Sequence, residues 1–296
     1  MKIDAKVQSI SKLKDYFFLV PDYQREYVWK PDDEVEQFLI DIENEYSPDA
    51  KEQRNYFLGS IIIANNDRCF DVVDGQQRLT TIMLSLCVFR DLLKKETLNS
   101  AQKNYLQIIE NLLYNFDIES GETRVRLELQ YEESHDYLTA LIQEQPYNGV
   151  RSPSIERMQD AYTKILRHFQ LYAGIDELID FAKYCLTKIE LVVIESQDLS
   201  SALKIFETIN QRGAGLNAMD LVKNLLFKAT KLLDSKFYIG VNTALNRFKN
   251  DFQYNFTGWN KSSVEARQKI LLELVFDTWR INDLRLDRDV FNEFIK

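Results

Sequence analysis

The segment 56–93 most constrains the fold, because its pattern changes from strand to helix at a single glycine. Two apolar runs, 56–64 and 69–73, flank the turn residues 65–67 and predict a β-hairpin. After this glycine the apolar residues follow helical spacing, at Leu79, Ile82, Met83, Leu86, Phe89 and Leu93. The sequence therefore predicts a hairpin, a tight turn at Asp74–Gly75 and a long helix from Gln76.

The rest of the chain predicts mainly helices. A short helix or arm is expected over 1–15, and a helix begins at Pro31. Further helices are expected near 101–116, 131–143, 154–172, 175–187, 199–209 and 218–231, and strands near 16–20, 124–129 and 189–195. We expect an α+β fold. Its parts are a small mixed unit over 1–95, a mostly helical region over 96–235, and C-terminal helices over 236–296, with the start of a larger C-terminal region as an open alternative for the last part.

The cysteines and histidines exclude several classes of site. Cys69, Cys87 and Cys185 are far apart and form no CxxC pair, which argues against a disulfide scaffold or a zinc ribbon and fits a cytoplasmic protein. His135 and His168 lack the neighbours that a Ser-His-Asp triad, an HExxH zinc site or an HNH nuclease needs. No apolar stretch reaches the ~20 residues of a membrane span, so we expect no membrane association.

Charge is unevenly divided between the two halves of the chain. Residues 1–150 hold 16 basic and 27 acidic side chains, a net charge of −11, and residues 151–296 hold 21 basic and 19 acidic, a net charge of +2. A strongly acidic N-terminal half provides a poor surface for non-specific DNA binding. Any contact with nucleic acid is therefore expected in the second half or through a partner. A solvated acidic surface without a binding role is the simpler alternative.

A first candidate segment is VPDYQREYVW, residues 20–29. It places Gln24 and Arg25 in a loop between a predicted strand and a predicted helix. The planar fork of an arginine suits phosphate recognition, and such loops commonly carry binding residues. The alternative is a surface loop whose aromatic residues attach it to the core.

A second candidate segment is DVVDGQQRLTT, residues 71–81. A helix that begins just after Gly75 presents unpaired backbone N–H groups and the positive end of its dipole, and both favour an anion. Asp74 either orients an arginine, holds a metal, positions a water or merely caps the helix. No GxxxxGK[ST] phosphate loop occurs in the chain. Further donors within the first two turns are Gln76, Gln77, Arg78, Thr80 and Thr81.

A third candidate segment is FETINQRGAGLNAMDLVKNLLF, residues 206–227. Asn210 and Arg212 end one predicted helix, Gly213 reverses the chain, and Asp220 and Lys223 lie three residues apart on the next helix. We expect these side chains to meet the first two segments at one site. The alternatives are a solvated ion pair of little energetic value, or a separate patch that faces DNA or a partner subunit.

The order of the three motifs resembles the N-terminal domain of GmrSD-type restriction endonucleases, which phosphorothioate-sensing proteins of the SspE type share. The resemblance covers roughly residues 10–230, and the first ~95 residues also resemble the ParB/sulfiredoxin fold. It implies a bacterial phage-defence protein that recognises modified DNA. It also implies a nucleotide-hydrolysing domain, with GTP a frequent substrate.

The resemblance also implies roles for particular residues. Arg78, helped by Arg25, would neutralise phosphate charge, Gln76 or Gln77 would orient a water, and Asp74 would help to hold Mg²⁺. The catalytic residues would be Asp74, Gln76, Gln77 and Arg78, and the nucleotide-binding residues Gln24, Arg25, Gly75, Thr80, Asn210, Arg212, Gly213, Asp220 and Lys223.

Two departures from related patterns narrow this expectation. Sulfiredoxin chemistry needs a cysteine in the turn, and here glutamines follow Gly75 directly, which excludes redox repair. Full-length relatives often continue into an HNH nuclease, and this chain has no histidine after His168. We therefore expect a nucleotide-hydrolysing regulatory domain that does not cut DNA alone and works with a nuclease domain or subunit. A non-enzymatic DNA-recognition module, a scaffold for a nuclease and a homo-oligomeric assembly stay open.

Overall fold

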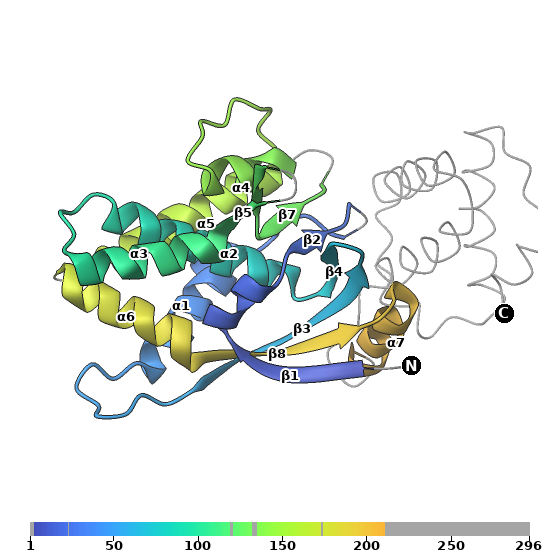
Figure 1. Ribbon diagram of the computed structural model, residues 1–296, viewed down its shortest axis with the longest axis horizontal. Coiled ribbons are helices and arrows are strands. Elements are labelled where there is room, and N and C mark those ends of the chain that lie inside the picture. The colour runs from blue at the N-terminus through green and yellow to red at the C-terminus, as the bar shows by residue number, and fades with distance from the viewer. Residues whose placement is uncertain (1–2, 23, 119–120, 132–134, 173, 211–296) are drawn as a thin grey trace, which may run out of the picture. The chain divides into compact units, whose positions relative to one another are not determined.

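A six-stranded mixed sheet runs through the first of two compact units, Met1–Phe206 and Glu207–Lys296. The structure is a computed structural model that describes residues 3–22, 24–118, 121–131, 135–172 and 174–210 (Figure 1). The strand order is β1-β8-β3-β4-β2-β7. The bounds of these strands are β1 Ile3–Ser9, β2 Phe18–Val20, β3 Tyr56–Asn66, β4 Cys69–Asp74, β7 Leu127–Leu129 and β8 Ile189–Ser196.

Strand β8 lies between two strands from the beginning of the chain. It pairs antiparallel with β1, where Val192 is opposite Val7, and parallel with β3, where Val192 is opposite Ser60. The β3–β4 hairpin is antiparallel, and β2 is parallel to both β4 and β7. A separate two-stranded sheet consists of β5 (Tyr114–Asp117) and β6 (Glu122–Val125). The main sheet therefore joins segments from opposite ends of the first unit, as the pairing of Ile3 with Ser196 shows.

Helix α2 is the centre of the helical layer. Fifteen of its eighteen residues are buried, and it packs against α3, α5 and α6 (Figure 1). Local signals set several helix starts: Asn99 and Gln102 form a reciprocal capping box at α3, and Ser152 caps α5. The helical segments are η1 Ile10–Asp15, η2 Pro31–Val35, α1 Glu36–Glu45, α2 Gln76–Leu93, α3 Ser100–Leu113, α4 His135–Ile142, α5 Pro153–Phe169, α6 Ile175–Lys188 and α7 Leu199–Asn210.

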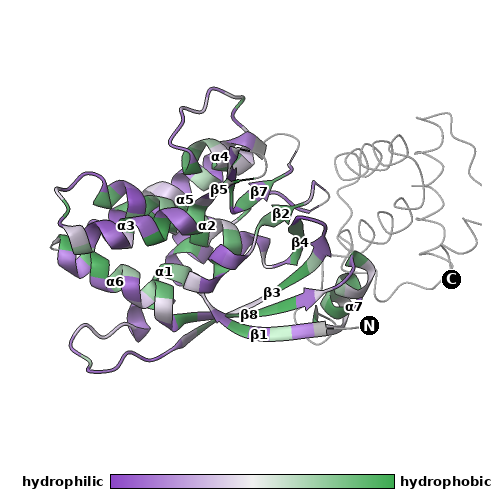
Figure 2. Cartoon of the chain, in the orientation of Figure 1, coloured by the Kyte–Doolittle hydropathy of each residue, from purple (hydrophilic) through white to green (hydrophobic). Residues whose placement is uncertain are grey.

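Hydropathy follows this layering. Figure 2 shows β8 mainly in the hydrophobic colour and the loop between α1 and β3 in the hydrophilic one.

None of the helices in the described part of the chain is long and apolar enough to cross a membrane.

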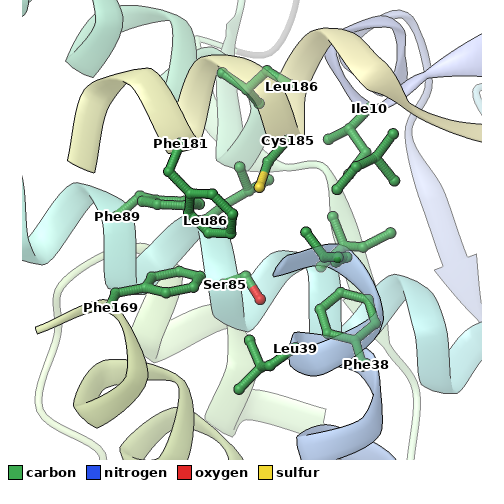
Figure 3. A pocket seen from close by; sticks show the side chains of 13 residues that line it. Ile10, Phe38, Leu39, Ser85, Leu86, Phe89, Phe169, Phe181, Cys185 and Leu186 are labelled. Atoms are coloured by element: carbon green, nitrogen blue, oxygen red, sulfur yellow. The ribbon is translucent and has the colours of Figure 1, made fainter. Parts of the chain in front are cut away.

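A small apolar cavity lies between α1, α2, α5 and α6 (Figure 3). Its volume is about 20 Å³, and Phe38, Phe89, Phe181 and Cys185 are among its lining residues. The hydroxyl of Ser85, the one polar side chain in the lining, donates to the carbonyl of Thr81 within α2 at 2.9 Å. The cavity offers little to a charged ligand, because a site of this kind stays dry.

The α+β class predicted from the sequence is confirmed. The predicted helix or arm over 1–15 is wrong for residues 3–9, which form β1 because they pair along the whole of β8. The helix predicted over 101–116 ends at Leu113, where the β5–β6 hairpin begins, and the strand predicted over 124–129 is divided between two sheets. The boundary near residue 95 and the ParB/sulfiredoxin likeness stay predictions, and the helices predicted after 210 lie outside the described residues.

Candidate functional site

The corner between β4 and α2 is built around Gly75. Its φ of +87° lies in the left-handed region, and an added Cβ would lie 2.6 Å from the Cγ2 of Ile61. A side chain is therefore excluded twice, by conformation and by space. Its carbonyl accepts the first helical hydrogen bond from Leu79 at 3.0 Å. Within the described part of the chain no side chain caps this end of α2.

Asp74 is the acidic group of this corner. Burial raises the pKa of its carboxyl above the ordinary value, while a hydrogen bond from the backbone of Gly75 opposes that change. The positive charges of Arg78 and Arg25 also act to lower this pKa, with smaller effect. Neither arginine forms an ion pair with Asp74 in the described structure. The corner therefore brings two cations near one carboxylate.

Arg78 reaches from the first turn of α2 back to β3. Its Nη1 donates to the carbonyl of Ser60 at 2.8 Å. The pairing of β3 with β4 ends at Ile62 opposite Asp74, so the Ser60 carbonyl lies beyond the last residue of β4 and needs another donor. Burial lowers the pKa of Arg78, and the charge of Asp74 opposes this. A guanidinium nevertheless stays charged at neutral pH.

The loop after β2 is fixed to α2 by Gln77. The Oε1 of Gln77 accepts a hydrogen bond from the N–H of Val28 at 2.8 Å, and its Nε2 donates to the carbonyl of Glu26 at 3.0 Å. Tyr27 strengthens the attachment from within the core, because its hydroxyl lies 2.9 Å from that of Thr81. Hydrogen bonds from α2 therefore attach this irregular loop to the helix.

A second connection passes through two amides. Gln24 donates to the carbonyl of Val73 at 3.1 Å, and Gln76 donates to the Oε1 of Gln24 at 3.3 Å. The hydroxyl of Tyr131 then donates to the Oε1 of Gln76. Tyr131 is a site residue that the sequence interpretation missed. It is 55 positions from Gln76, and no local pattern marks it.

Arg25 is an exposed cation of this loop. Its charge acts on Asp74, so the structure brings Gln24, Arg25, Asp74 and Arg78 together at the start of α2. Thr80 is placed differently, since it is only 1 % exposed inside the helical layer. Asn210 is the last residue of α7. The predicted residues Arg212, Gly213, Asp220 and Lys223 lie outside the described residues, so their convergence on this corner stays a prediction.

The metal-binding capacity of the corner is limited. No group of three or more His, Cys, Asp or Glu residues within the described ranges could hold a metal ion by itself. Mg²⁺ differs from most metals in this respect, because it is commonly held by one or two carboxylates together with the phosphates of a substrate. Asp74 would therefore supply one carboxylate ligand to a magnesium ion that is held mainly by phosphates.

Comparison with known families decides the classification. The family model described as "GmrSD restriction endonuclease, N-terminal domain" matches residues 7–227. The chain belongs to this family. As a GmrSD N-terminal domain it is a restriction-system domain, and the matched region contains all three sequence motifs. A search of curated proteins found no match.

Proposed function

We propose that the β4–α2 corner binds the phosphates of a nucleoside triphosphate and supports its hydrolysis. The chain would then be a regulatory domain of a modification-dependent restriction system, with GTP favoured as the family resemblance implies. The observation that carries this proposal is the convergence of Arg25 and Arg78 on Asp74, without pairing, at an uncapped helix start.

The balance of charge suits a polyphosphate. The helix N-terminus contributes about half a positive charge, and the two arginines contribute two more. An ionised Asp74 removes one of these charges and would itself repel a phosphate. Mg²⁺ would resolve this conflict, because Asp74 would help to hold the ion and the ion would offset the negative charge of the phosphates. When bound, the ion would withdraw charge from the transferring phosphoryl group.

The two glutamines would have two tasks. Gln77 holds the loop that carries Arg25, and Gln76 orders Gln24. Each amide has two donor hydrogens and two acceptor lone pairs, so both glutamines can form further hydrogen bonds besides those observed. We propose that this remaining capacity of Gln76 or Gln77 orients the attacking water. Preorganised donors of this kind lower the barrier because they need no rearrangement during the reaction.

The family also suggests the partners. A restriction-system domain that handles nucleotide would control a nuclease domain or subunit of the HNH type and respond to modified DNA. Because residues 1–150 carry a net charge of −11, this half of the chain is expected to contact DNA through a partner and not directly.

The test is a screen of ATP, GTP, CTP and UTP with and without Mg²⁺. We expect one nucleotide, GTP first, to raise the thermal unfolding midpoint in the presence of Mg²⁺ and to release phosphate. The Arg25→Ala variant is the control and should lose both effects while it unfolds like the wild type. If no nucleotide at millimolar concentration shifts the midpoint, the proposal is wrong. Steeply salt-dependent DNA binding without nucleotide would instead indicate a DNA-recognition module.

A further inference from the structure

Strand β3 has an irregularity at Gly59. Its register with β8 shifts between Phe57 and Gly59, so one extra residue, Leu58, is accommodated there. Gly59 itself has a φ of +127°. Residues other than glycine rarely adopt this conformation, and such bulges commonly redirect the chain next to functional sites.

The space above Gly59 is occupied by the guanidinium of Arg78. A Cβ at Gly59 would lie 2.9 Å from both the Cζ and the Nη2 of Arg78, and 3.2 Å from its Nε. The next residue, Ser60, supplies the carbonyl that accepts from Nη1 at 2.8 Å. The bulge therefore provides a flat surface for the guanidinium plane and an acceptor for one of its nitrogens.

We propose that Gly59 is a positioning residue for Arg78, an inference that rests on the proposed function of the corner. With Nη1 anchored on Ser60, the Nε and Nη2 groups remain, and they make no hydrogen bond to any part of the chain that the structure describes. These two N–H groups form the side-on fork that binds two oxygens of one phosphate. Gly59 would set the plane of this fork before a ligand arrives, which lowers the conformational entropy lost on binding.

The test is a double-mutant cycle between Gly59→Ala and Arg78→Ala. Gly121→Ala is the matched control, because Gly121 also has a positive φ, +72°, and an added Cβ there meets nothing within 4 Å. We expect Gly59→Ala to weaken binding of the Mg²⁺ complex of GTP at least tenfold and Gly121→Ala to leave it unchanged. In the Arg78→Ala background, Gly59→Ala should cause no further loss of binding.

The same cycle is measured by denaturant unfolding, which needs no ligand. We expect Gly59→Ala to cost less stability when Arg78 is already truncated, because the close contact is then gone. If no nucleotide binds the wild type, the proposed function fails. If the effects of the two substitutions on the free energy of unfolding are additive, Gly59 does not position Arg78 and the further proposal is wrong. If Gly59→Ala does not fold, NMR relaxation of the Arg78 Nε–H in the ligand-free wild type decides instead. An ordered group is expected, and a freely mobile one would overturn the proposal.

Discussion

Gln77 accepts a hydrogen bond from the backbone N–H of Val28, 49 positions earlier in the chain. The contact joins the first turn of α2 to the loop that carries Arg25. A motif that resembles a ligand-binding sequence therefore also performs a structural task, since both polar groups of this amide hold backbone.

Truncation of Gln77 should loosen that loop. Gln77→Ala removes the hydrogen bonds to the N–H of Val28 and to the carbonyl of Glu26, and loss of the acceptor for Val28 alone costs about 1–3 kcal/mol. We expect lower stability in denaturant unfolding and faster hydrogen exchange at Val28. Gln77→Glu is the matched control, because it keeps the acceptor for Val28. It should protect Val28 better than Gln77→Ala, and equal exchange in the two variants would contradict this assignment.

Loss of Arg25 should affect the ligand and not the fold. Its side chain is exposed and forms no hydrogen bond to the described residues. We expect Arg25→Ala to change the free energy of unfolding by less than about 0.5 kcal/mol. Because a charge-assisted bond is worth about 1.5–3 kcal/mol, nucleotide affinity measured by calorimetry should fall at least tenfold. Unchanged affinity would remove Arg25 from the site.

Arg78 and Arg90 should respond differently to truncation. Arg78→Ala removes the donor to Ser60 and should cost about 1–3 kcal/mol, while it abolishes nucleotide turnover and leaves a weakened but measurable nucleotide binding. Arg90 is 1 % exposed, pairs with Asp91 and donates to the carbonyl of Leu141 at 3.0 Å. Arg90→Ala should therefore cost about 3–5 kcal/mol. If instead Arg78→Ala unfolds as easily as Arg90→Ala and its folded fraction still turns over nucleotide, Arg78 is structural.

Tyr131 should matter through its hydroxyl alone. Tyr131→Phe leaves the buried Oε1 of Gln76 without this donor and should lower the free energy of unfolding by about 1–3 kcal/mol. Tyr147→Phe is the matched control, since the Tyr147 hydroxyl donates to the carbonyl of Val150 on the surface. Its effect should stay within about 0.5 kcal/mol. Equal losses of stability in the two variants would show that the hydrogen bond from Tyr131 to Gln76 adds no more stability than a surface hydrogen bond.

Asp74 should make stability depend on pH. Because burial raises its native pKa above the ordinary value of 3.8, the folded state binds this proton more tightly than the unfolded state. The stability that the protonated carboxyl of Asp74 contributes is therefore present at low pH, and it is lost as the pH rises through the native pKa of Asp74. We expect Asp74→Asn to unfold at a higher denaturant concentration than the wild type at pH 7 and to show no advantage below 3.8. A lower midpoint at pH 7 would show that the ionised carboxylate stabilises the fold.

Local patterns predicted the parts of the site that are continuous in sequence. The hairpin, the turn at Gly75 and α2 follow from periodicity and one glycine, and the attachment of the first loop to α2 agrees with the expectation that these two segments meet. Strand β1 was not predicted, although Ile3, Ala5 and Val7 alternate with polar residues as they do in a strand.

Other parts depend on distant contacts. Tyr131 reaches Gln76 only because β7 pairs with β2, a parallel pairing that neither segment indicates alone. Gly59 lies within an apolar strand pattern, and its task is visible only when the guanidinium of Arg78 is placed above it. Sequence periodicity describes the neighbours of a residue along one element, and both of these contacts cross between elements.

The position of β8 between β1 and β3 has a consequence for biosynthesis. At about 5–20 residues per second, a ribosome needs roughly 10–40 s to reach Ser196, where β8 ends. Until then β1 has no partner and β3 presents one unpaired edge to every other nascent chain nearby. Pairings between such distant segments also form slowly. The first strand to leave the ribosome is thus among the last to be secured, and during this interval the newborn chain carries an open strand edge that could pair with another chain.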